Sequence, residues 1–299
     1  LRSSVLTDDP FLSDVASHLI AAGGKRLRPV LALGAAYAGV GSATDDVVQG
    51  AVAVELVHLG SLYHDDVMDE AATRRGVETV NAKWGNLQAI LAGDFLLSRA
   101  SEIAASLGTE VAALLARTIG RLCEGQIEEL RHTYNAARPE VSYLSSISGK
   151  TASLFATAAR IGGLVADLPR PAVDALTEYG EAFGMVFQIV DDLLDLMATD
   201  AQLGKPAGHD MVEGVYTLPV LRTLQAGGVA AVELLAGQTS LMFANLPTVI
   251  QYARGQDLLD PDAPARAGVV QELRSGELLL RRTDAELRVP RSEEHTSEL

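Results

Sequence analysis

Two acidic motifs of the same form stand inside long helix-forming segments of this chain. They read DDVMD at 65–69 and DDLLD at 191–195, so each places carboxylates at positions i, i+1 and i+4. In a helix of about 3.6 residues per turn, the first and last of these lie on one face. Like charges at that spacing weaken a helix by roughly 0.2–0.5 kcal/mol per pair, so helix stability does not explain them. Any fold for this chain therefore has to supply cations to two acidic helix faces.

The second motif makes the stronger demand, because it interrupts the apolar run MVFQIVDDLLDLM at 185–197. Burying an unpaired carboxylate there would cost several kcal/mol. Several carboxylate oxygens together suit hard divalent cations such as Mg²⁺. The alternative is a pair of solvated acidic helix faces, but two copies in matched apolar surroundings weaken that interpretation. The candidate metal ligands are Asp65, Asp66, Asp69, Asp191, Asp192 and Asp195.

The composition favours a helical globular protein with a sizeable core. The 299 residues are 48% hydrophobic and only 5% aromatic, and the helix formers Ala, Leu and Glu are abundant. The net charge of −15 makes nucleic acid and anionic lipid surfaces poor partners, so an anionic substrate would need a locally basic pocket. Cys123 is the only cysteine, which excludes an intrachain disulfide and suits a reducing, cytoplasmic location.

Helical periodicity recurs along almost the whole chain. The predicted helices span 26–38, 45–70, 87–107, 110–134, 150–166, 172–199, 217–236 and 266–286. We find no convincing strand pair and no linker rich in Pro, Gly or Ser. We therefore predict one all-α domain, a large helical bundle. No apolar run is long enough to span a membrane.

Basic residues are scarce, but several lie close in sequence to the acidic motifs. In the string GGKRLRP at 23–29, three basic residues follow a glycine pair. Two arginines follow the first motif by one turn, and a lysine in a Gly/Pro loop follows the second. Lys150 and Thr151 are predicted to open a helix, where backbone N–H groups favour anions. Each alone would be a solvated surface residue, but their placement beside Mg²⁺-type carboxylates describes a diphosphate site. These residues are Lys25, Arg26, Arg28, Arg74, Arg75, Lys150, Thr151 and Lys205.

With these strings in view, the sequence resembles the trans-isoprenyl diphosphate (polyprenyl) synthases of the long-chain type. The matching strings follow the order and spacing of that family over residues 20–225. They are GGKRLRP, SLYHDDVMDEAATRRG, LAGDFLL, GKTASLF, FQIVDDLLDL and GKPAGHDMVEGVYTLP. A single DDxxD is shared with class I terpene cyclases, whereas two of them with these basic strings are highly specific.

The resemblance implies a single bundle of antiparallel helices around a deep central cavity, in a synthase domain at 1–290. Asp65 and Asp69 would hold two Mg²⁺ on an allylic diphosphate, and Asp191 would hold a third, supported by the other aspartates of the motifs. The residues implied in catalysis are Asp65, Asp69, Asp191, Arg74, Lys150 and Lys205. Contacts to the allylic diphosphate would come from Arg74, Lys150, Thr151, Gln188 and Lys205, and contacts to isopentenyl diphosphate from Lys25, Arg28, His58 and Arg75. From the residues alone, His58 would be a core histidine.

The implied reaction is a Mg²⁺-dependent, head-to-tail condensation of isopentenyl diphosphate with farnesyl or geranylgeranyl diphosphate. We expect a long-chain all-trans product, hexaprenyl or beyond, for a quinone side chain. The reason is that Gly60, Ser61 and Val57, on the turns before the first motif, are small and should leave a channel open. The resemblance also implies a homodimer, for which the Ala- and Leu-rich segments 87–107 and 110–134 could offer an apolar face.

Other functions stay open: a class I terpene cyclase, a geranylgeranyl diphosphate synthase, or a non-catalytic subunit of a heteromeric synthase. A cyclase should carry an Asn/Ser/Glu triad in place of the second motif, and such subunits usually lose one motif. The chain departs from the family at Val215, where many members have a lysine, in the atypical segment 237–257, and in lacking a basic C-terminal tail. The final residues at 291–299 resemble a translated sequencing adapter, so we expect them to be non-native; without an initiator Met, we also expect the natural N-terminus to be missing.

Overall fold

The structure, a computed structural model, describes residues 1–197, 208–227, 268–274, 277–282 and 286–290. The chain divides into two compact units. The first comprises Leu1–Gln126 with Ile147–Val186, and the second comprises Ile127–Ser146 with Phe187–Leu299. Two helices, α6 (Thr109–Arg131) and α9 (Arg170–Met197), continue from the first unit into the second. The single-domain organisation expected from the sequence stays a prediction.

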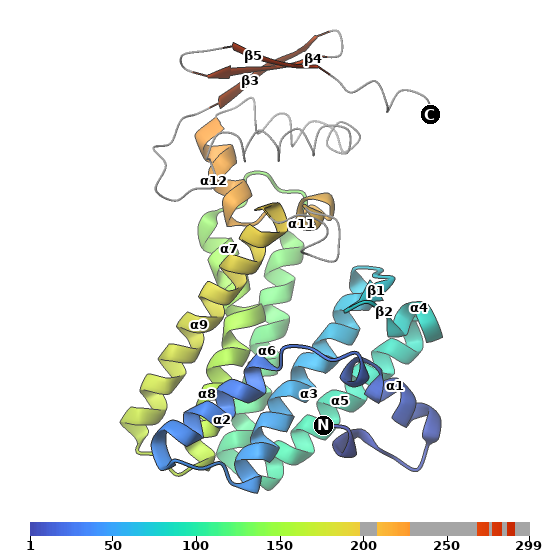
Figure 1. Cartoon of the computed structure of the whole chain (residues 1–299), viewed down its shortest axis with the longest axis vertical. Helices are drawn as coiled ribbons and strands as arrows, with labels where there is room; N and C mark the ends of the chain where they lie inside the picture. The colour runs from blue at the N-terminus through green and yellow to red at the C-terminus, as the bar shows by residue number, and fades with distance from the viewer. Residues whose placement is uncertain (198–207, 228–267, 275–276, 283–285, 291–299) are drawn as a thin grey trace. The chain divides into compact units, whose positions relative to one another are not determined.

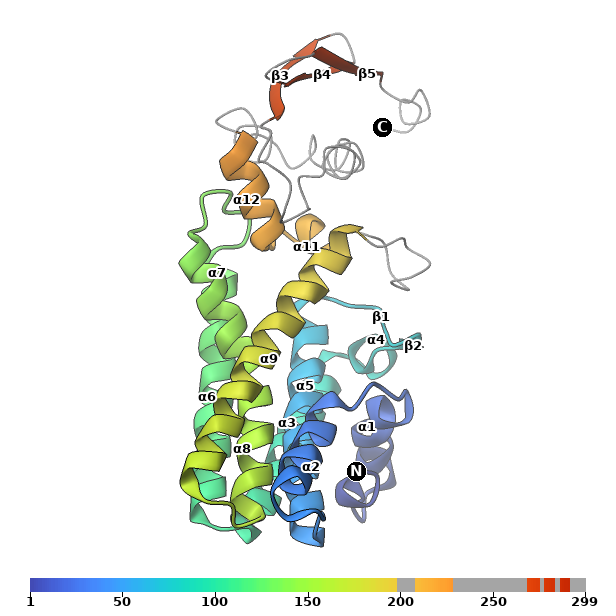
Figure 2. The same ribbon diagram turned by 60° about the vertical axis from the view of Figure 1, so that its left-hand side comes forward.

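The first unit is a bundle of helices (Figures 1 and 2). In it α3 packs against α5, α2 packs against α8, and α3 also contacts α2 and α8. Its elements are η1 (Ser3–Val5), α1 (Pro10–Ala21), α2 (Leu27–Val40), α3 (Asp45–Met68), α4 (Val80–Trp84), α5 (Asn86–Ser106), the π-helical turn η2 (Ser148–Ala152) and α8 (Ser153–Val165), with the first parts of α6 and α9. A short hairpin of β1 (Thr73–Arg74) and β2 (Val77–Glu78) connects α3 to α4.

The second unit contains a helical part and a small sheet. Its helices are α7 (Glu140–Ile147), α11 (His209–Val212) and α12 (Leu218–Gly227), with the ends of α6 and α9. The antiparallel sheet consists of β3 (Gly268–Arg274), β4 (Glu277–Arg282) and β5 (Glu286–Pro290) in that order. The helix predicted at 266–286 is therefore wrong, as is the expectation that no strands pair. Apolar runs this short cannot be assigned to helix or strand by periodicity alone.

Most of the other predicted helices are confirmed to within a few residues, and the body of the described chain is all-α. The helices α2, α3, α5, α6 and α9 correspond to the predictions at 26–38, 45–70, 87–107, 110–134 and 172–199. Residues 228–236 of the helix predicted at 217–236, the atypical segment 237–257 and the tail at 291–299 lie outside the described residues. Among the residues that are described, no helix is long and apolar enough to cross a membrane.

Side-chain caps explain where two of the N-terminal helices begin. The carboxylate of Asp9 accepts hydrogen bonds from the backbone N–H groups of Phe11 (2.9 Å) and Leu12 (3.3 Å), at the start of α1. The hydroxyl of Thr44 accepts a hydrogen bond from the N–H of Val47 (3.4 Å), at the start of α3. Each cap satisfies donors that the first turn of a helix cannot satisfy itself.

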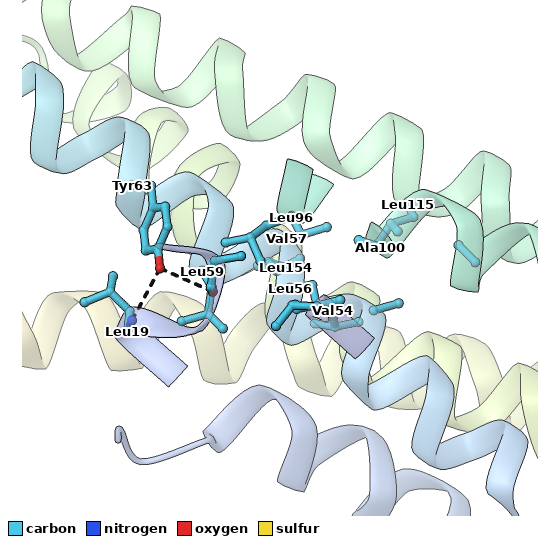
Figure 3. Close-up of a cluster of buried hydrophobic side chains, with 14 of the residues drawn as sticks. Leu19, Val54, Leu56, Val57, Leu59, Tyr63, Leu96, Ala100, Leu115 and Leu154 are labelled. Atoms are coloured by element: carbon cyan, nitrogen blue, oxygen red, sulfur yellow. Dashed lines mark hydrogen bonds between the residues drawn. The ribbon is translucent and has the colours of Figure 1, made fainter. Parts of the chain in front are cut away.

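Helix α3 supplies the centre of the core in the first unit. Leu56, Val57 and Leu59 are fully buried and belong to one apolar cluster with residues of α5 and α8 (Figure 3). Tyr63 is buried in the same cluster, and its hydroxyl donates a hydrogen bond to the carbonyl of Val15 at 2.8 Å. The helix that carries the first acidic motif is thus held by neighbours on several sides.

Gly60 lies on the face of α3 that packs against α5. A Cβ atom built at Gly60 would stand 3.0 Å from the carbonyl oxygen of Gly93 and 3.2 Å from Leu97 Cγ. Val57 is completely buried, so it does not line open space either. Close packing of α3 on α5 thus surrounds Gly60, and the expectation that Gly60, Ser61 and Val57 leave a channel open stays a prediction. Ser61 is half-buried and remains a candidate.

The contact between α2 and α8 is close enough to exclude a side chain at one position. A Cβ atom built at Gly162 of α8 would stand 2.1 Å from the carbonyl oxygen of Ala32 in α2. At Gly34, also in α2, the same built atom would have nothing within 4 Å. These two glycines separate the effect of close packing from the effect of helix propensity.

We expect Gly162→Ala to lower the free energy of unfolding by about 1–3 kcal/mol or more, because the two helices would have to move apart. Gly34→Ala should leave it unchanged or raise it by up to about 1 kcal/mol, since alanine favours helix over glycine. Urea unfolding followed by circular dichroism measures both changes. Equal values for the two variants would contradict the close approach of α2 and α8.

Candidate active site

The first acidic motif lies at the C-terminal end of α3. Asp66 is fully buried, Asp65 is half-buried, and Asp69 is exposed at the end of the helix. Asp66 Oδ1 accepts a hydrogen bond from Arg74 Nε at 2.5 Å, while its Oδ2 is buried without a hydrogen-bond partner among the described residues. Burial raises the pKa of Asp66, and the charge of Arg74 opposes that shift. Within the described part of the chain, the motif therefore contains a buried carboxylate oxygen without a hydrogen-bond donor.

Arg75 reaches the same region from the turn of the β1–β2 hairpin. The two central residues of this turn, Arg75 and Gly76, have φ values of 54° and 76°, as a tight hairpin turn requires. For an arginine this left-handed backbone is strained, and such strain concentrates at functional sites. Arg75 Nη1 donates hydrogen bonds to the carbonyls of Leu19 (3.4 Å) and Gly23. The guanidinium of Arg75 also explains why residue 24 is a glycine. A Cβ atom at Gly24 (φ +131°) would stand 2.8 Å from Arg75 Nη1.

Glu55 is a buried counter-ion for these arginines, and sequence analysis missed it. Its side chain is 2% exposed, and Oε1 accepts a hydrogen bond from Arg26 Nη1 at 2.5 Å. Arg26 also donates to the carbonyl of Ile20 at 3.1 Å, and it stands before α2 in a left-handed conformation with φ of 51°. The signal that could have found Glu55 is its place in the apolar stretch AVELV at 53–57. A carboxylate is not buried there without a partner.

Arg28 and His58 lie near Glu55 and its arginines and form one basic cluster with them. The guanidinium carbon of Arg28 stands 4.4 Å from the centre of the Phe155 ring, a cation–π contact. Burial lowers the pKa of Arg28 to about 10; Glu55 opposes this shift and Arg75 adds to it. Burial, followed by the charge of Arg28, lowers the pKa of His58 well below 6.5, so this imidazole is neutral at pH 7. The structure therefore brings Arg28, His58 and Arg75 close together, and their expected contact with isopentenyl diphosphate stays a prediction.

Lys150 and Thr151 lie in η2, between α7 and α8. Helical structure is continuous from Glu140 to Val165, so these two residues do not open a helix as predicted. Their backbone N–H groups are not those of a helix start, and that argument for an anion site is wrong. Thr151 is buried and Lys150 is half-buried. A single π-helical turn inside a longer helix is frequent at functional sites.

The second acidic motif lies near the end of α9, in the second unit. Asp191 is exposed, whereas Asp192 and Asp195 are buried. Asp192 Oδ2 accepts a hydrogen bond from the Tyr143 hydroxyl at 2.5 Å, and Oδ1 accepts one from Gln188 Nε2 at 2.8 Å. Burial raises the pKa of Asp192 to about 6, and the two hydrogen bonds oppose that shift. Gln188, expected to contact a diphosphate, binds Asp192 in this structure.

The carboxylates of the two motifs fit Mg²⁺, although they form no complete cage. In the described part of the chain, no group of three or more His, Cys, Asp or Glu side chains is arranged to hold a metal ion. Mg²⁺ is commonly held by one or two carboxylates together with water and substrate phosphates. Carboxylates of this kind are Asp69 and one oxygen of Asp66 in the first motif, and Asp191 in the second motif. Lys25 is exposed just before α2, and Lys205 lies outside the described residues.

Comparison with known sequences identifies the family. The chain matches the model of the polyprenyl synthetase family over residues 9–240, which include both acidic motifs. It is 43% identical over 262 residues to heptaprenyl diphosphate synthase component 2 of Geobacillus stearothermophilus, a match that covers 87% of this chain and 81% of the relative. It is 41% identical over 228 residues to nonaprenyl diphosphate synthase of Mycobacterium tuberculosis, covering 76% of this chain and 68% of that one.

The fold agrees with the sequence matches. A polyprenyl synthase from Caulobacter crescentus CB15, whose crystal structure is a complex with calcium and isoprenyl diphosphate, has a TM-score of 0.81 and 35% sequence identity to this chain. That similarity covers 87% of this chain and 80% of the other. The chain therefore belongs to the polyprenyl synthetase family.

Removing the buried counter-ion should destabilise the basic cluster. We expect Glu55→Ala to lower the free energy of unfolding by about 3–5 kcal/mol, because Arg26 would be left unpaired among other arginines. The matched control is Glu102→Ala, which removes the exposed partner of Arg99 and should cost at most about 1 kcal/mol.

Urea unfolding measures both variants, and added pyrophosphate provides a second readout. The anion should restore part of the lost stability in Glu55→Ala but not in Glu102→Ala, since it replaces the missing negative charge. Equal losses in the two variants would contradict the role of Glu55.

Proposed function

We propose that this chain is a Mg²⁺-dependent prenyltransferase that condenses isopentenyl diphosphate head to tail onto an allylic diphosphate. The observation that carries the proposal is the cluster of Arg26, Arg28, Arg74 and Arg75 near Glu55, beside the first acidic motif. Several guanidinium groups in one place suit the oxygens of a diphosphate. Membership of the polyprenyl synthetase family and the isoprenyl diphosphate in the Caulobacter crescentus structure support this substrate class.

In the proposed reaction, the arginines bind and orient the diphosphates, and neutral His58 donates a hydrogen bond without adding charge. Asp65, Asp69 and Asp191 would hold Mg²⁺, three ions in all, which would neutralise the leaving diphosphate. Cleavage of the allylic carbon–oxygen bond yields pyrophosphate and an allylic cation. The double bond of isopentenyl diphosphate attacks the cation to form a carbon–carbon bond. A proton then leaves to the pyrophosphate, so the step needs no side-chain base.

We expect Asp65→Ala and Asp191→Ala each to lower turnover by about 100-fold or more, since each removes a proposed ligand of the ions that stabilise the leaving group. EDTA should abolish product formation, and added Mg²⁺ should restore it. Asp174→Ala, which removes an exposed aspartate paired with Arg160, is the control and should keep full activity. Incorporation of radiolabelled isopentenyl diphosphate with farnesyl diphosphate is the measurement. Full activity in either motif variant would overturn the metal assignment.

We further propose a long-chain product, as in the side chain of a respiratory quinone. The names of the heptaprenyl and nonaprenyl relatives support this length. Gly60 and Val57, two of the residues expected to set this length, are buried in the packing around α3. Ser61, half-buried and one turn before Asp65 on the same face of α3, is the position left to test.

We expect Ser61→Phe to shorten the product while the first condensation continues, because a ring there would fill the space along which the chain grows. Ser61→Ala keeps the position small and should keep the product length. Reverse-phase chromatography of the dephosphorylated products measures both. A dominant geranylgeranyl peak from the unaltered chain would favour a geranylgeranyl diphosphate synthase instead.

We also propose that the chain forms a homodimer. On α5, Leu87, Ile90 and Leu91 are 73%, 40% and 65% exposed, and their spacing puts them on one face of the helix. Sedimentation equilibrium should give twice the chain mass of 31.5 kDa. Leu91→Glu should shift the protein towards monomer, and Val48→Glu, at an exposed apolar residue of α3, should not. A monomeric unaltered chain would refute the proposal.

A second candidate function is that of a subunit that works only with a partner protein. It is favoured by the name of the Geobacillus stearothermophilus relative, a component 2. The presence of both acidic motifs favours an enzyme that is active alone. Assaying the purified chain by itself separates the two: product without a second protein supports the enzyme, and product only after one is added supports the subunit.

A further inference from the structure

A buried polar network connects Asp192 of the second acidic motif to residues in and before α7. The reaction proposed above assigns no role to these residues. Arg138, Tyr143, Ser146 and Asp192 are 3%, 1%, 0% and 3% exposed. Arg138 lies just before α7, Tyr143 and Ser146 lie in α7, and Asp192 lies in α9. Polar groups buried together are costly unless each is hydrogen-bonded, so a network of this size requires a physical reason.

Both carboxylate oxygens of Asp192 are occupied by protein donors. The Tyr143 hydroxyl donates to Oδ2 at 2.5 Å, and Gln188 Nε2 donates to Oδ1 at 2.8 Å. Gln188 precedes Asp192 by one turn of the same helix, whereas Tyr143 reaches it from α7. The tyrosine therefore ties the end of α9 that carries the second motif to a different element.

Tyr143 is also contacted by Arg138 and Ser146. The guanidinium carbon of Arg138 stands 5.7 Å from the centre of the Tyr143 ring. Arg138 Nη2 donates to Ser146 Oγ at 2.6 Å, and Nη1 donates to the carbonyl of Tyr216 at 3.5 Å. Ser146 Oγ in turn donates to the carbonyl of Tyr143 at 2.8 Å. These contacts connect the ring and the backbone of Tyr143 to Arg138 and Ser146.

The second aspartate of each acidic motif is buried and accepts a short hydrogen bond from another element, but the two donors differ in charge. Asp66 accepts its hydrogen bond from Arg74, and Asp192 accepts its hydrogen bond from Tyr143, at 2.5 Å in each case. Arg74 is a cation and neutralises the carboxylate it holds. Tyr143 is a neutral hydroxyl, so it fixes the carboxylate in place without an ion pair.

We propose that Tyr143 is a positioning residue for the metal site of the second motif. By holding Asp192, it sets the orientation of α9 in which the adjacent Asp191 presents its exposed carboxylate to a divalent cation. This proposal rests on the proposed function, because it assumes that the second motif binds the metal. The competing explanation is that the hydrogen bond only stabilises the packing of α7 on α9.

The test is Tyr143→Phe, with Tyr63→Phe as the matched control. Both variants remove one hydrogen-bonded hydroxyl from a buried ring, but Tyr63 bonds to the backbone of α1. Binding of Mn²⁺ in the presence of pyrophosphate is followed by electron paramagnetic resonance, which needs no turnover. We expect Tyr143→Phe to raise the half-saturating Mn²⁺ concentration by about 10-fold or more, because residues that support metal ligands typically contribute this much.

Tyr63→Phe should lower the melting temperature to a similar extent and leave Mn²⁺ binding within about twofold, as expected for a merely structural hydroxyl. In turnover assays, Tyr143→Phe should lower kcat and leave KM for isopentenyl diphosphate unchanged. If Tyr143→Phe alters only the melting temperature, the proposal is overturned. If Mn²⁺ binding depends on Tyr143 but the unaltered chain forms no product, the positioning role stands and the prenyl transfer proposal fails.

Two further variants keep the test decisive. In an Asp192→Asn background, Tyr143→Phe should cause no additional change in Mn²⁺ binding, since the tyrosine acts through Asp192; an additional 10-fold change would overturn the proposal. If Tyr143→Phe does not fold, Ser146→Ala loosens the support of the tyrosine and keeps its hydroxyl. A several-fold weaker Mn²⁺ affinity in Ser146→Ala supports the proposal, and an unchanged affinity overturns it.

Discussion

The buried ion pair between Glu55 and Arg26 holds together a group of arginines that would otherwise repel one another. Glu55 lies in the middle of α3, and the packing that buries its apolar neighbours also buries its carboxylate. A buried carboxylate without a partner would be strongly destabilising. The start of α2 and the β1–β2 turn therefore have to place their arginines beside it. The same arrangement concentrates positive charge next to the first acidic motif, in a chain whose net charge is −15.

Two of these arginines have backbone conformations that are unfavourable for residues other than glycine. Arg26 and Arg75 both adopt left-handed backbone conformations that favour glycine, and each guanidinium makes hydrogen bonds that offset the strain. Gly24 leaves room for the guanidinium of Arg75. A strained residue with a defined set of partners is held in one position, which suits a site that has to bind an anion without rearranging. In the second motif, the hydroxyl of Tyr143 holds the carboxylate of Asp192 by a hydrogen bond.

The sequence predicted the helices that carry the site more reliably than the details of the site itself. The bounds of α3 and α9 and the burial of Asp192 follow from apolar periodicity and could be read directly. The role of Glu55 could not be predicted in this way, because the arginines near it come from the start of α2 and from a hairpin turn, which are distant in sequence. The predicted helix start at Lys150 was wrong, because α7 continues into α8 through a π-helical turn. Apolar periodicity does not indicate such a turn.

By itself, the sequence determined the helical class of the chain, the two acidic motifs and the basic strings near them, and hence the kind of ligand to expect. These features depend on residue type and on spacing along a helix, which are local properties. Only the tertiary structure decided which side chain pairs with each buried carboxylate. It paired Asp66 with Arg74 and Asp192 with Tyr143, and it packed Gly60 against α5. Such contacts depend on how helices distant in sequence pack, and periodicity within one helix carries no information about its neighbours.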